Sequence, residues 1–409
     1  MNFIGKRFLV YILLIVSVFG GLAGCTQEVN NINTSTELSM EEKLEDFEYL
    51  YTIISDNYPF LKVNERVNGI NWLEQKTKYI ELIKASNSDM DFMYNISAIV
   101  KDLNNGHTHV IDKENFTRYY TVYTNPKQGK SLKPWAKVFK NKTVLEWYGF
   151  KENESADTKK QGFFNLNTPA FISDIITPNQ VAYLQINQMN GEKIEEDGKE
   201  IRNFYEKIKD YNKLIIDIRG NSGGDDLYWI ENVIEPLAKE RTSVDNYIFT
   251  RGKYGKSFYK ARRIKQSPVT SIAKSILEDF PEEVNTDFDY YYISSRVVVP
   301  KDPVNFNGKI YLLVDKAVYS SSESFASFCK DSGFATLVGS TTGGDGIGID
   351  PLFFSLPNSG IVVRFSSLLA LNGDGTINEE VQTTPDIEID PTIGTSYKTD
   401  EAIQYILNN

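Results

Sequence analysis

The sequence predicts an α/β protein in which a core with a mainly parallel sheet follows a small helical domain. Three observations support this prediction. Between Leu38 and Leu103, apolar residues recur at steps of three and four, which is the period of amphipathic helices. From residue 178 onward, apolar runs of β-forming residues alternate with helical segments, an order typical of parallel sheets. A buried strand that ends at Val314 is followed by a serine-rich helix start, Tyr319-Ser320-Ser321-Ser322-Glu323.

The N-terminal 38 residues are expected to lie outside the folded part. Two basic residues precede an almost wholly apolar run, Phe8 to Phe19, and Leu22-Ala23-Gly24-Cys25 follows, which is the layout of an export signal. The Leu-Ala-Gly-Cys end resembles the lipobox of bacterial lipoproteins. This resemblance implies that residues 1–24 are a cleaved signal peptide, that Cys25 carries a lipid, and that the protein is anchored to the cell membrane on its extracytoplasmic side. A plain signal peptide or an uncleaved anchor are the alternatives. Residues 25–38 are rich in Asn, Thr and Ser and are expected to form a flexible linker.

Composition excludes some functions. The formal net charge is −11, so the chain has no basic surplus with which to neutralise the phosphates of a nucleic acid. No cluster of His, Cys and carboxylate residues has the spacing of metal ligands, so no metal and no organic cofactor is expected. The chain has two histidines, His107 and His109, and a general base that uses imidazole must be one of them.

The remaining chain is divided into four predicted segments. Residues 39–113 form the N-terminal helical domain and residues 114–177 a β-rich connecting region, with strands near Tyr119 to Tyr123 and Thr143 to Tyr148. Residues 178–396 form the α/β core, and residues 397–409 a C-terminal helix. Within the core, Val181 to Ile186, Leu214 to Ile218 and Lys309 to Val314 are the expected buried strands.

Two strand ends carry residues that are suited to chemistry. Ser320 and Glu323 have the S-x-x-E spacing of a capping box, which places a serine beside the unpaired N–H groups of a helix start. An ordinary helix cap would look the same. The other strand end is Asp217-Ile218-Arg219-Gly220-Asn221-Ser222-Gly223-Gly224, whose glycines allow the backbone to approach closely. Because carboxyl ends of parallel strands share one edge of a sheet, we expect the two segments to meet.

Four motifs resemble those of the tail-specific (C-terminal processing) serine peptidases, and they occur in family order across residues 178–390. The motifs are the Asp-x-Arg-x-Asn-x-Gly-Gly segment from Asp217, the Ser-x-x-Glu turn from Ser320, the Gly-x-x-Thr-x-Gly segment from Gly339, and Pro385-Asp386. The resemblance implies a ClpP/crotonase-like αβ core. It also implies that Ser320 is the nucleophile and that the backbone of Gly223 or Gly224 and of Ser321 stabilises the oxyanion. The substrate would be a peptide or an unfolded polypeptide, cleaved through an acyl-enzyme.

The general base separates two branches of this family. The branch with a Ser-Lys dyad carries its lysine about 25 residues after the serine, and here that position is Asp345. An aspartate cannot replace a neutral lysine amine as a base without a large pKa shift. The tricorn-like branch uses a histidine upstream of the core and a glutamate seven residues before the Asp of Pro-Asp. In this sequence those positions match His107, which would be the general base, and Glu379, which would orient or polarise the site.

Several alternatives remain open at these positions. His109 could replace His107, Glu380 could replace Glu379, and Ser321 or Ser322 could replace Ser320. Residues 114–177 are short for a PDZ domain, so no intact PDZ is expected. A binding protein that keeps the fold without turnover is the alternative function, and an esterase is a further one. The sequence does not indicate the physiological substrate or the oligomeric state.

Overall fold

A computed structural model describes residues 37–126, 129–151 and 168–409. Leu38–Asn409 form one compact unit. The predicted signal peptide and Cys25 lie outside the described residues, as do residues 152–167 of the predicted connecting region. Within the described ranges, no helix combines the length and the apolar character that a membrane crossing requires.

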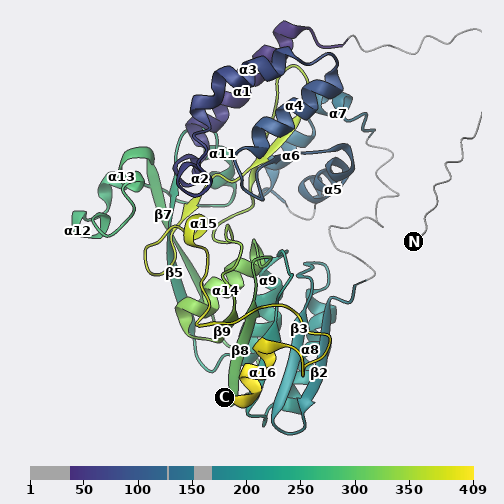
Figure 1. Ribbon diagram of the computed structural model, residues 1–409, viewed down its shortest axis with the longest axis vertical. Coiled ribbons are helices and arrows are strands. Elements are labelled where there is room, and N and C mark those ends of the chain that lie inside the picture. Colours follow the sequence, from purple (N-terminus) through teal and green to yellow (C-terminus); the bar gives the residue numbers. More distant parts are fainter. Residues whose placement is uncertain (1–36, 127–128, 152–167) are drawn as a thin grey trace, which may run out of the picture. The chain divides into compact units, whose positions relative to one another are not determined.

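The core is a six-stranded sheet with the order β13-β9-β8-β4-β3-β2 (Figure 1). Five neighbouring strands are parallel, and β2 alone pairs antiparallel within this sheet. The strands are β2 (Phe171–Thr177), β3 (Val181–Ile186), β4 (Lys213–Asp217), β8 (Lys309–Val314), β9 (Thr336–Gly339) and β13 (Ile387–Glu388). The predicted mainly parallel sheet is therefore confirmed.

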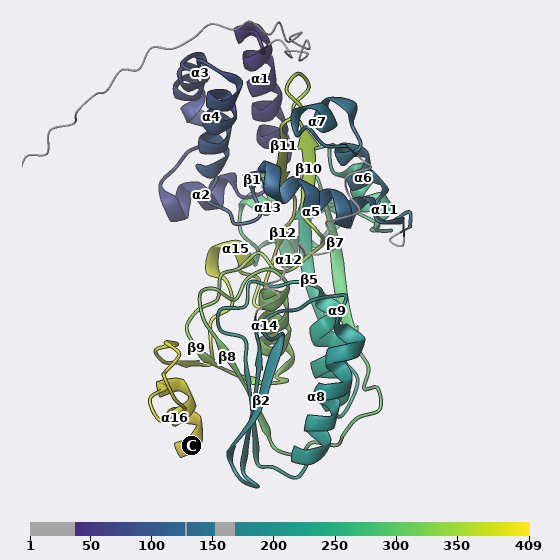
Figure 2. The same ribbon diagram turned by 90° about the vertical axis from the view of Figure 1, so that its right-hand side faces the viewer.

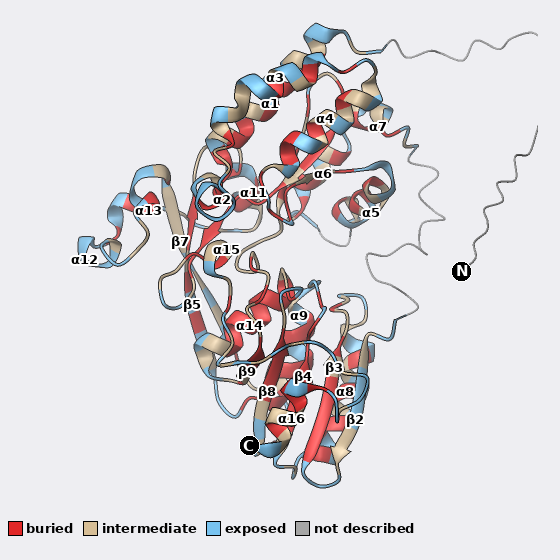
Figure 3. Cartoon of the chain, viewed as in Figure 1, coloured by how far each residue is buried: buried red, intermediate tan, exposed pale blue. Residues whose placement is uncertain are grey.

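Alternate residues of the strands pack against helices on opposite faces of the sheet. Leu214 and Ile216 belong to a core that also contains Phe204 of α8 (Ile194–Ile208) and Phe325 of α14 (Ser321–Ser332). Ile215, between them, packs instead with residues of α16 (Glu401–Asn408). In Figure 2, α8 and α14 lie on one side of the strands and α16 on the other. Because side chains alternate along a strand, a continuous apolar run such as that of β4 is buried on both faces (Figure 3).

The predicted N-terminal helical region is confirmed. It contains α1 (Met40–Asn57), α2 (Leu61–Asn68), α3 (Lys76–Lys84) and α4 (Asp89–Lys101). The serine at residue 39 begins α1 with a complete capping box to Glu42. After α4, a turn leads to the short strand β1 (His109–Val110). This turn carries His107.

The β-rich connecting region predicted for residues 114–177 is wrong for most of its described part. The chain forms α5 (Lys113–Thr124), α6 (Lys133–Phe139) and α7 (Lys142–Trp147), and β2 alone agrees with the prediction. Aromatic and β-branched residues suggested strands here. The buried residues Phe116, Tyr119, Tyr120 and Tyr123, however, recur at helical spacing and pack as one face of α5.

The predicted core segment, residues 178–396, does not lie wholly within the α/β core, because parts of it pack with the N-terminal helical region. Its hairpin, β10 (Leu352–Ser355) and β11 (Val362–Phe365), packs with the helical region, and β11 pairs with β1. A long ribbon of β5 (Thr242–Thr250) and β7 (Tyr290–Val298) also leaves the core (Figure 1). Its lower part packs on the α/β core through Val244 and Val298, and its upper part packs on the helical region through Phe249. These contacts join the helical region to the α/β core, and they bring the turn that carries His107 to the core.

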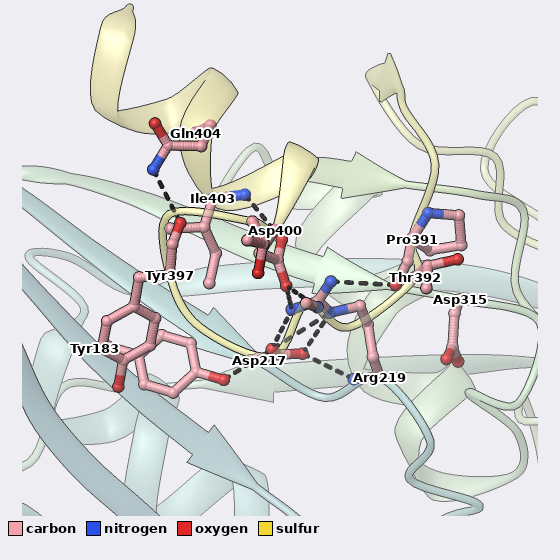
Figure 4. Close-up of polar contacts among 12 residues, drawn as sticks. Tyr183, Asp217, Arg219, Asp315, Pro391, Thr392, Tyr397, Asp400, Ile403 and Gln404 are labelled. Atoms are coloured by element: carbon pink, nitrogen blue, oxygen red, sulfur yellow. Dashed lines mark hydrogen bonds and ion pairs between the residues drawn. The ribbon is translucent and has the colours of Figure 1, made fainter.

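A buried ion-pair cluster at the end of β4 holds the loop that follows it (Figure 4). The fully buried guanidinium of Arg219 donates to Asp217 at 2.6 Å and to Asp400 at 2.9 Å. It also donates to the carbonyl of Pro391 at 3.0 Å, and Tyr183 donates to Asp217 at 2.8 Å. Since each charge has several partners, the cluster ties the C-terminal segment to the strand end that precedes Gly223 and Gly224.

Candidate active site

Ser320 lies on a strained turn between β8 and α14. Its backbone has φ 57° and ψ −125°, a conformation that residues other than glycine rarely adopt. The predicted capping box with Glu323 is wrong, because Ser320 makes no side-chain cap to α14. Within the described chain, its hydroxyl also has no hydrogen-bond partner. A serine held in such a strand-to-helix turn exposes its oxygen at the strand ends, as in a nucleophile elbow.

Glu323 instead supports the turn from inside the protein. Its carboxyl oxygen Oε1 accepts hydrogen bonds from Asn378 Nδ2 at 2.7 Å and from Thr383 Oγ1 at 2.6 Å. Its other oxygen, Oε2, is buried without a partner among the described residues. Burial raises the pKa of this side chain. Glu323 therefore connects α14 with the segment that carries Glu379.

The Gly-Gly loop reaches the serine turn, as the strand order predicts. The N–H of Tyr319 donates to the carbonyl of Asn221, and a side chain at Gly223 would lie 2.8 Å from the backbone nitrogen of Ser321. With φ at 104°, Gly223 also adopts a conformation that favours glycine. Its N–H is already used, since it donates to Asn221 Oδ1 at 2.9 Å. Gly224 follows with φ 151° and packs against the Met189 backbone.

His107 is brought to the site by the turn before β1. A side chain at Gly106 would lie 3.1 Å from the Tyr319 ring, so the glycine permits a close approach. The rings of His107 and Tyr319 are 4.7 Å apart between centroids. His107 thus lies beside the residue that directly precedes Ser320. His109 lies two residues on, in β1, where its register partner is Arg364 of β11.

Asp345 is the residue that binds His107. The carboxylate oxygen Oδ2 of Asp345 accepts a hydrogen bond from His107 Nδ1 at 2.9 Å. The same oxygen accepts from Ser366 Oγ at 2.6 Å, Asn105 Nδ2 at 2.9 Å and the Tyr319 hydroxyl at 3.2 Å. Burial by itself would raise the pKa of Asp345, but attraction to His107 and these hydrogen bonds lower it below the usual value. Asp345 is therefore ionised at neutral pH.

Glu379, rather than Glu380, faces this group. Its Oε1 accepts from Asn105 Nδ2 at 2.9 Å, so one amide serves both Glu379 and Asp345. Its Oε2 is buried without a partner in the described chain. Burial and repulsion from Asp345 raise its pKa well above the usual value. Glu380, on the same short helix α15 (Asn378–Val381), pairs with Arg66 of α2 at 2.8 Å.

Both imidazoles are neutral at neutral pH. Burial lowers the pKa of His107, Asp345 opposes this, and Arg364 adds to it. Burial and Arg364 lower the pKa of His109 to about 4. Because Nδ1 of His107 donates to Asp345, its Nε2 carries a lone pair. A neutral imidazole in this state can accept a proton from a hydroxyl.

A cavity of about 160 Å³ adjoins Glu379. Its walls include Phe60, Val63 and Asn64 from the helical region and Gly343, Glu379 and Gln382 from the core. No three His, Cys, Asp or Glu side chains in residues 37–126, 129–151 and 168–409 are grouped so as to hold a metal ion.

Comparison with known proteins identifies the family. The model of peptidase family S41 matches residues 180–389, which is more than half of the chain. The chain belongs to peptidase family S41. The predicted tail-specific peptidase family is thereby confirmed, and the S41 protein is in broad class a serine-type peptidase that acts on peptides or proteins. No curated protein sequence matches the chain.

Solved structures share the fold of this S41 chain. A protein of Parabacteroides merdae ATCC 43184, described as a candidate peptidase, is 17% identical, with a TM-score of 0.57, over 90% of this chain and 95% of that chain. Mature CPAF in complex with lactacystin is 12% identical, with a TM-score of 0.53, over 85% of this chain and 94% of that chain. At these identities the similarity is one of fold alone.

The S41 site brings together most of the residues singled out in the sequence. Ser320, Ser321, Gly223, Gly224, His107 and Glu379 lie in segments that contact one another. The partner role of Asp345 was missed. Asp345 was noted only as the position where a lysine is absent. The sequence does contain a carboxylate at this position and a histidine upstream, which together could suggest a pair. The two residues are 238 positions apart, however, and no local pattern shows that they are in contact.

Proposed function

We propose that this S41 protein is a serine peptidase that cleaves peptides or unfolded polypeptides through an acyl-enzyme on Ser320. The observation that supports this most strongly is the position of His107, which is bound through Nδ1 to Asp345 and packed beside Tyr319. No hydrogen bond joins His107 to Ser320 in the described chain, and we propose that substrate binding brings Nε2 to the serine hydroxyl. Hydrogen bonds at apo active sites are often long and shorten only when substrate binds.

In the proposed reaction, the Ser320 oxygen attacks the scissile carbonyl carbon while His107 Nε2 takes the hydroxyl proton. The carbonyl oxygen becomes an oxyanion that accepts hydrogen bonds from the backbone N–H groups of Gly224 and Ser321. We assign Gly224 rather than Gly223 because the N–H of Gly223 is already bonded to Asn221. His107 then returns the proton to the leaving amine, and water releases the acyl group by the same steps.

A fluorophosphonate probe tests this function. The wild-type chain should be labelled on one serine, and Ser320→Ala should abolish the labelling. Ser322→Ala is the matched control, because Ser322 lies two residues on in α14, with its hydroxyl turned to the sulfur of Met189 at 3.6 Å. Absence of labelling in folded wild-type protein would reject the peptidase and favour a binding protein that keeps the fold.

The acid limb of the pH–rate profile should have its midpoint below 6.5, the ordinary pKa of histidine. Protonated His107 cannot accept the serine proton, so kcat/KM falls as the pH drops through the pKa of His107, which burial lowers. Above that midpoint the rate should rise to a plateau once His107 is fully deprotonated. Peptide hydrolysis across pH 4.5 to 9 measures this. A midpoint above 6.5 that persists in His109→Gln would contradict the assigned environment of His107.

We further propose that the peptidase is exported and held at the membrane by a lipid on Cys25. The support is the export signal and the lipobox-like end in the sequence. Cys25→Ala should lose radiolabelled palmitate and move from the membrane to the soluble fraction of cells. Retention of both in the variant would reject the anchor.

A further inference from the structure

Asp345, which binds His107, shares one amide donor with a second carboxyl side chain, Glu379. Asn105 Nδ2 lies 2.9 Å from Asp345 Oδ2 and 2.9 Å from Glu379 Oε1. Two carboxylates held so close in a buried site repel each other, so one of them keeps a proton. The hydrogen bonds around each side chain decide which one is charged.

Asp345 accepts more hydrogen bonds than Glu379 does. Besides Asn105, the oxygen Oδ2 of Asp345 accepts from His107, Ser366 and Tyr319. Three of these four donors are neutral groups, so they favour a charged Asp345 whether or not His107 is protonated. Tyr319 remains a donor, because burial and the charge of Asp345 raise its pKa far above the usual value.

Glu379 has no comparable support. Asn105 is its one side-chain donor, and its oxygen Oε2 is buried and unpaired in the part of the chain described. Burial of an ionised carboxylate with so few donors is costly, whereas a protonated carboxyl group is tolerated. No hydrogen bond joins Glu379 to His107 among the described residues.

We infer that Asp345 is the positioning residue that orients His107 and balances its charge during catalysis. We infer that Glu379, which shares the amide of Asn105 with Asp345, is a neutral carboxylic acid. This inference rests on the proposed function. It departs from what the family resemblance implies, which is that Glu379 is the carboxyl group that orients or polarises the site. The position at which the dyad branch carries its catalytic lysine here holds the carboxylate that makes a histidine base possible.

The site contains further charged groups that face these residues. Arg364 of β11, Asp350 and His109 act on His107, and Glu323 and Asp345 act on Glu379. Arg364, Asp350 and Glu323 remain in place in all of the variants below, and the His109→Gln background is common to those in which His107 is titrated. A change in the His107 titration therefore reports on the carboxyl group that was replaced.

The decisive measurement is the titration of His107 in the full chain. Because His107 and His109 are the two histidines, ring-¹³C-histidine NMR in a His109→Gln background shows a single imidazole. Asp345→Asn should lower the pKa of His107 by about one pH unit or more, because it removes an opposite charge at 2.9 Å. Glu379→Gln should change it much less. Glu380→Gln, next in sequence and paired with Arg66, is the matched control.

Fluorophosphonate labelling of Ser320 gives the catalytic readout. Asp345→Asn should slow the labelling by about 10³-fold or more, as expected when a carboxylate that fixes the histidine tautomer becomes an amide. Glu379→Gln should slow it by less than about tenfold, which is the effect of one altered hydrogen bond. Asp345→Gly should regain part of its rate in the presence of formate, which can occupy the vacated carboxylate site.

The replacements at position 345 suit the backbone there, so a lower labelling rate is not expected to come from misfolding. Asp345 has φ 49°, a conformation that asparagine and glycine tolerate well. Ser366→Ala keeps the carboxylate and removes one donor, and it should slow labelling by about tenfold. The inference is overturned if Glu379→Gln lowers the pKa of His107 and the labelling rate strongly while Asp345→Asn does neither.

Failure of the proposed function gives a different pattern. If wild-type protein is not labelled but the pKa of His107 still depends on Asp345, the peptidase proposal fails and the His107–Asp345 pair stands. If labelling occurs and depends on Glu379 instead, the peptidase proposal stands and the assignment of Asp345 fails.

Discussion

Replacing His107 by glutamine should lower kcat/KM for peptide hydrolysis by about 10⁴-fold, the upper end of what a general base contributes. In the proposed reaction the imidazole takes the serine proton, and a carboxamide cannot do so. Glutamine keeps a donor that can reach Asp345, so the local structure should survive. Peptide hydrolysis and the rate of fluorophosphonate labelling measure the loss.

His109→Gln is the internal comparison for this prediction. His109 lies two residues on, in β1, but it has no contact with Asp345 in the described structure, and its pKa is about 4. Its replacement should cost less than about tenfold in rate, as expected for a residue outside the reacting groups. If His109→Gln were the more damaging variant, the general base would be His109 and the assignment of His107 would be wrong.

Arg219→Met should lower the free energy of unfolding by about 3–5 kcal/mol, because it leaves Asp217 and Asp400 as buried charges without their partner. Arg219 also begins the loop that leads to Gly223 and Gly224. We therefore expect kcat to fall in the folded fraction as well, since the loop that carries the proposed oxyanion donors loses its anchor. Urea unfolding followed by circular dichroism gives the stability, and active-site titration corrects the rate for unfolded protein.

Lys193→Met is the matched control for the stability measurement. It removes an exposed ion pair with Glu196, in which both side chains are about half exposed or more. Such pairs contribute about 0–1 kcal/mol. Equal stability of Arg219→Met and the wild-type chain would mean that the buried carboxyl groups are protonated or reached by water, and the cluster in Figure 4 would then not be an anchor.

Much of the α/β core could be predicted from the sequence because its signals are local. The runs at β3, β4 and β8 are continuous and apolar, which is what burial on both faces of a sheet requires. The helix α8 has acidic residues in its first turn and an apolar face, and both are visible in the sequence.

The predictions were wrong or incomplete where tertiary contacts determine the local structure. The aromatic residues of α5 suit a strand by propensity, but they lie at helical spacing and their rings pack against those of Phe139 and Phe353. Glu323 has the spacing of a helix cap, yet its buried carboxyl group accepts hydrogen bonds from Asn378 and Thr383 instead. The role of Asp345 depends on His107, Ser366 and Asn105, which come from distant parts of the chain. No spacing rule reaches across such distances.

The contact between His107 and Asp345 joins positions 238 apart along the chain, and this has a consequence for biosynthesis. During translation, the proposed base His107 leaves the ribosome long before the proposed nucleophile Ser320 and Asp345 have been made. A nascent chain therefore holds an isolated histidine, and no proton acceptor is set beside Ser320 until the later segments have folded onto the turn before β1. Under the proposed mechanism, hydrolysis requires this long-range contact, so activity is expected only after the tertiary structure has formed.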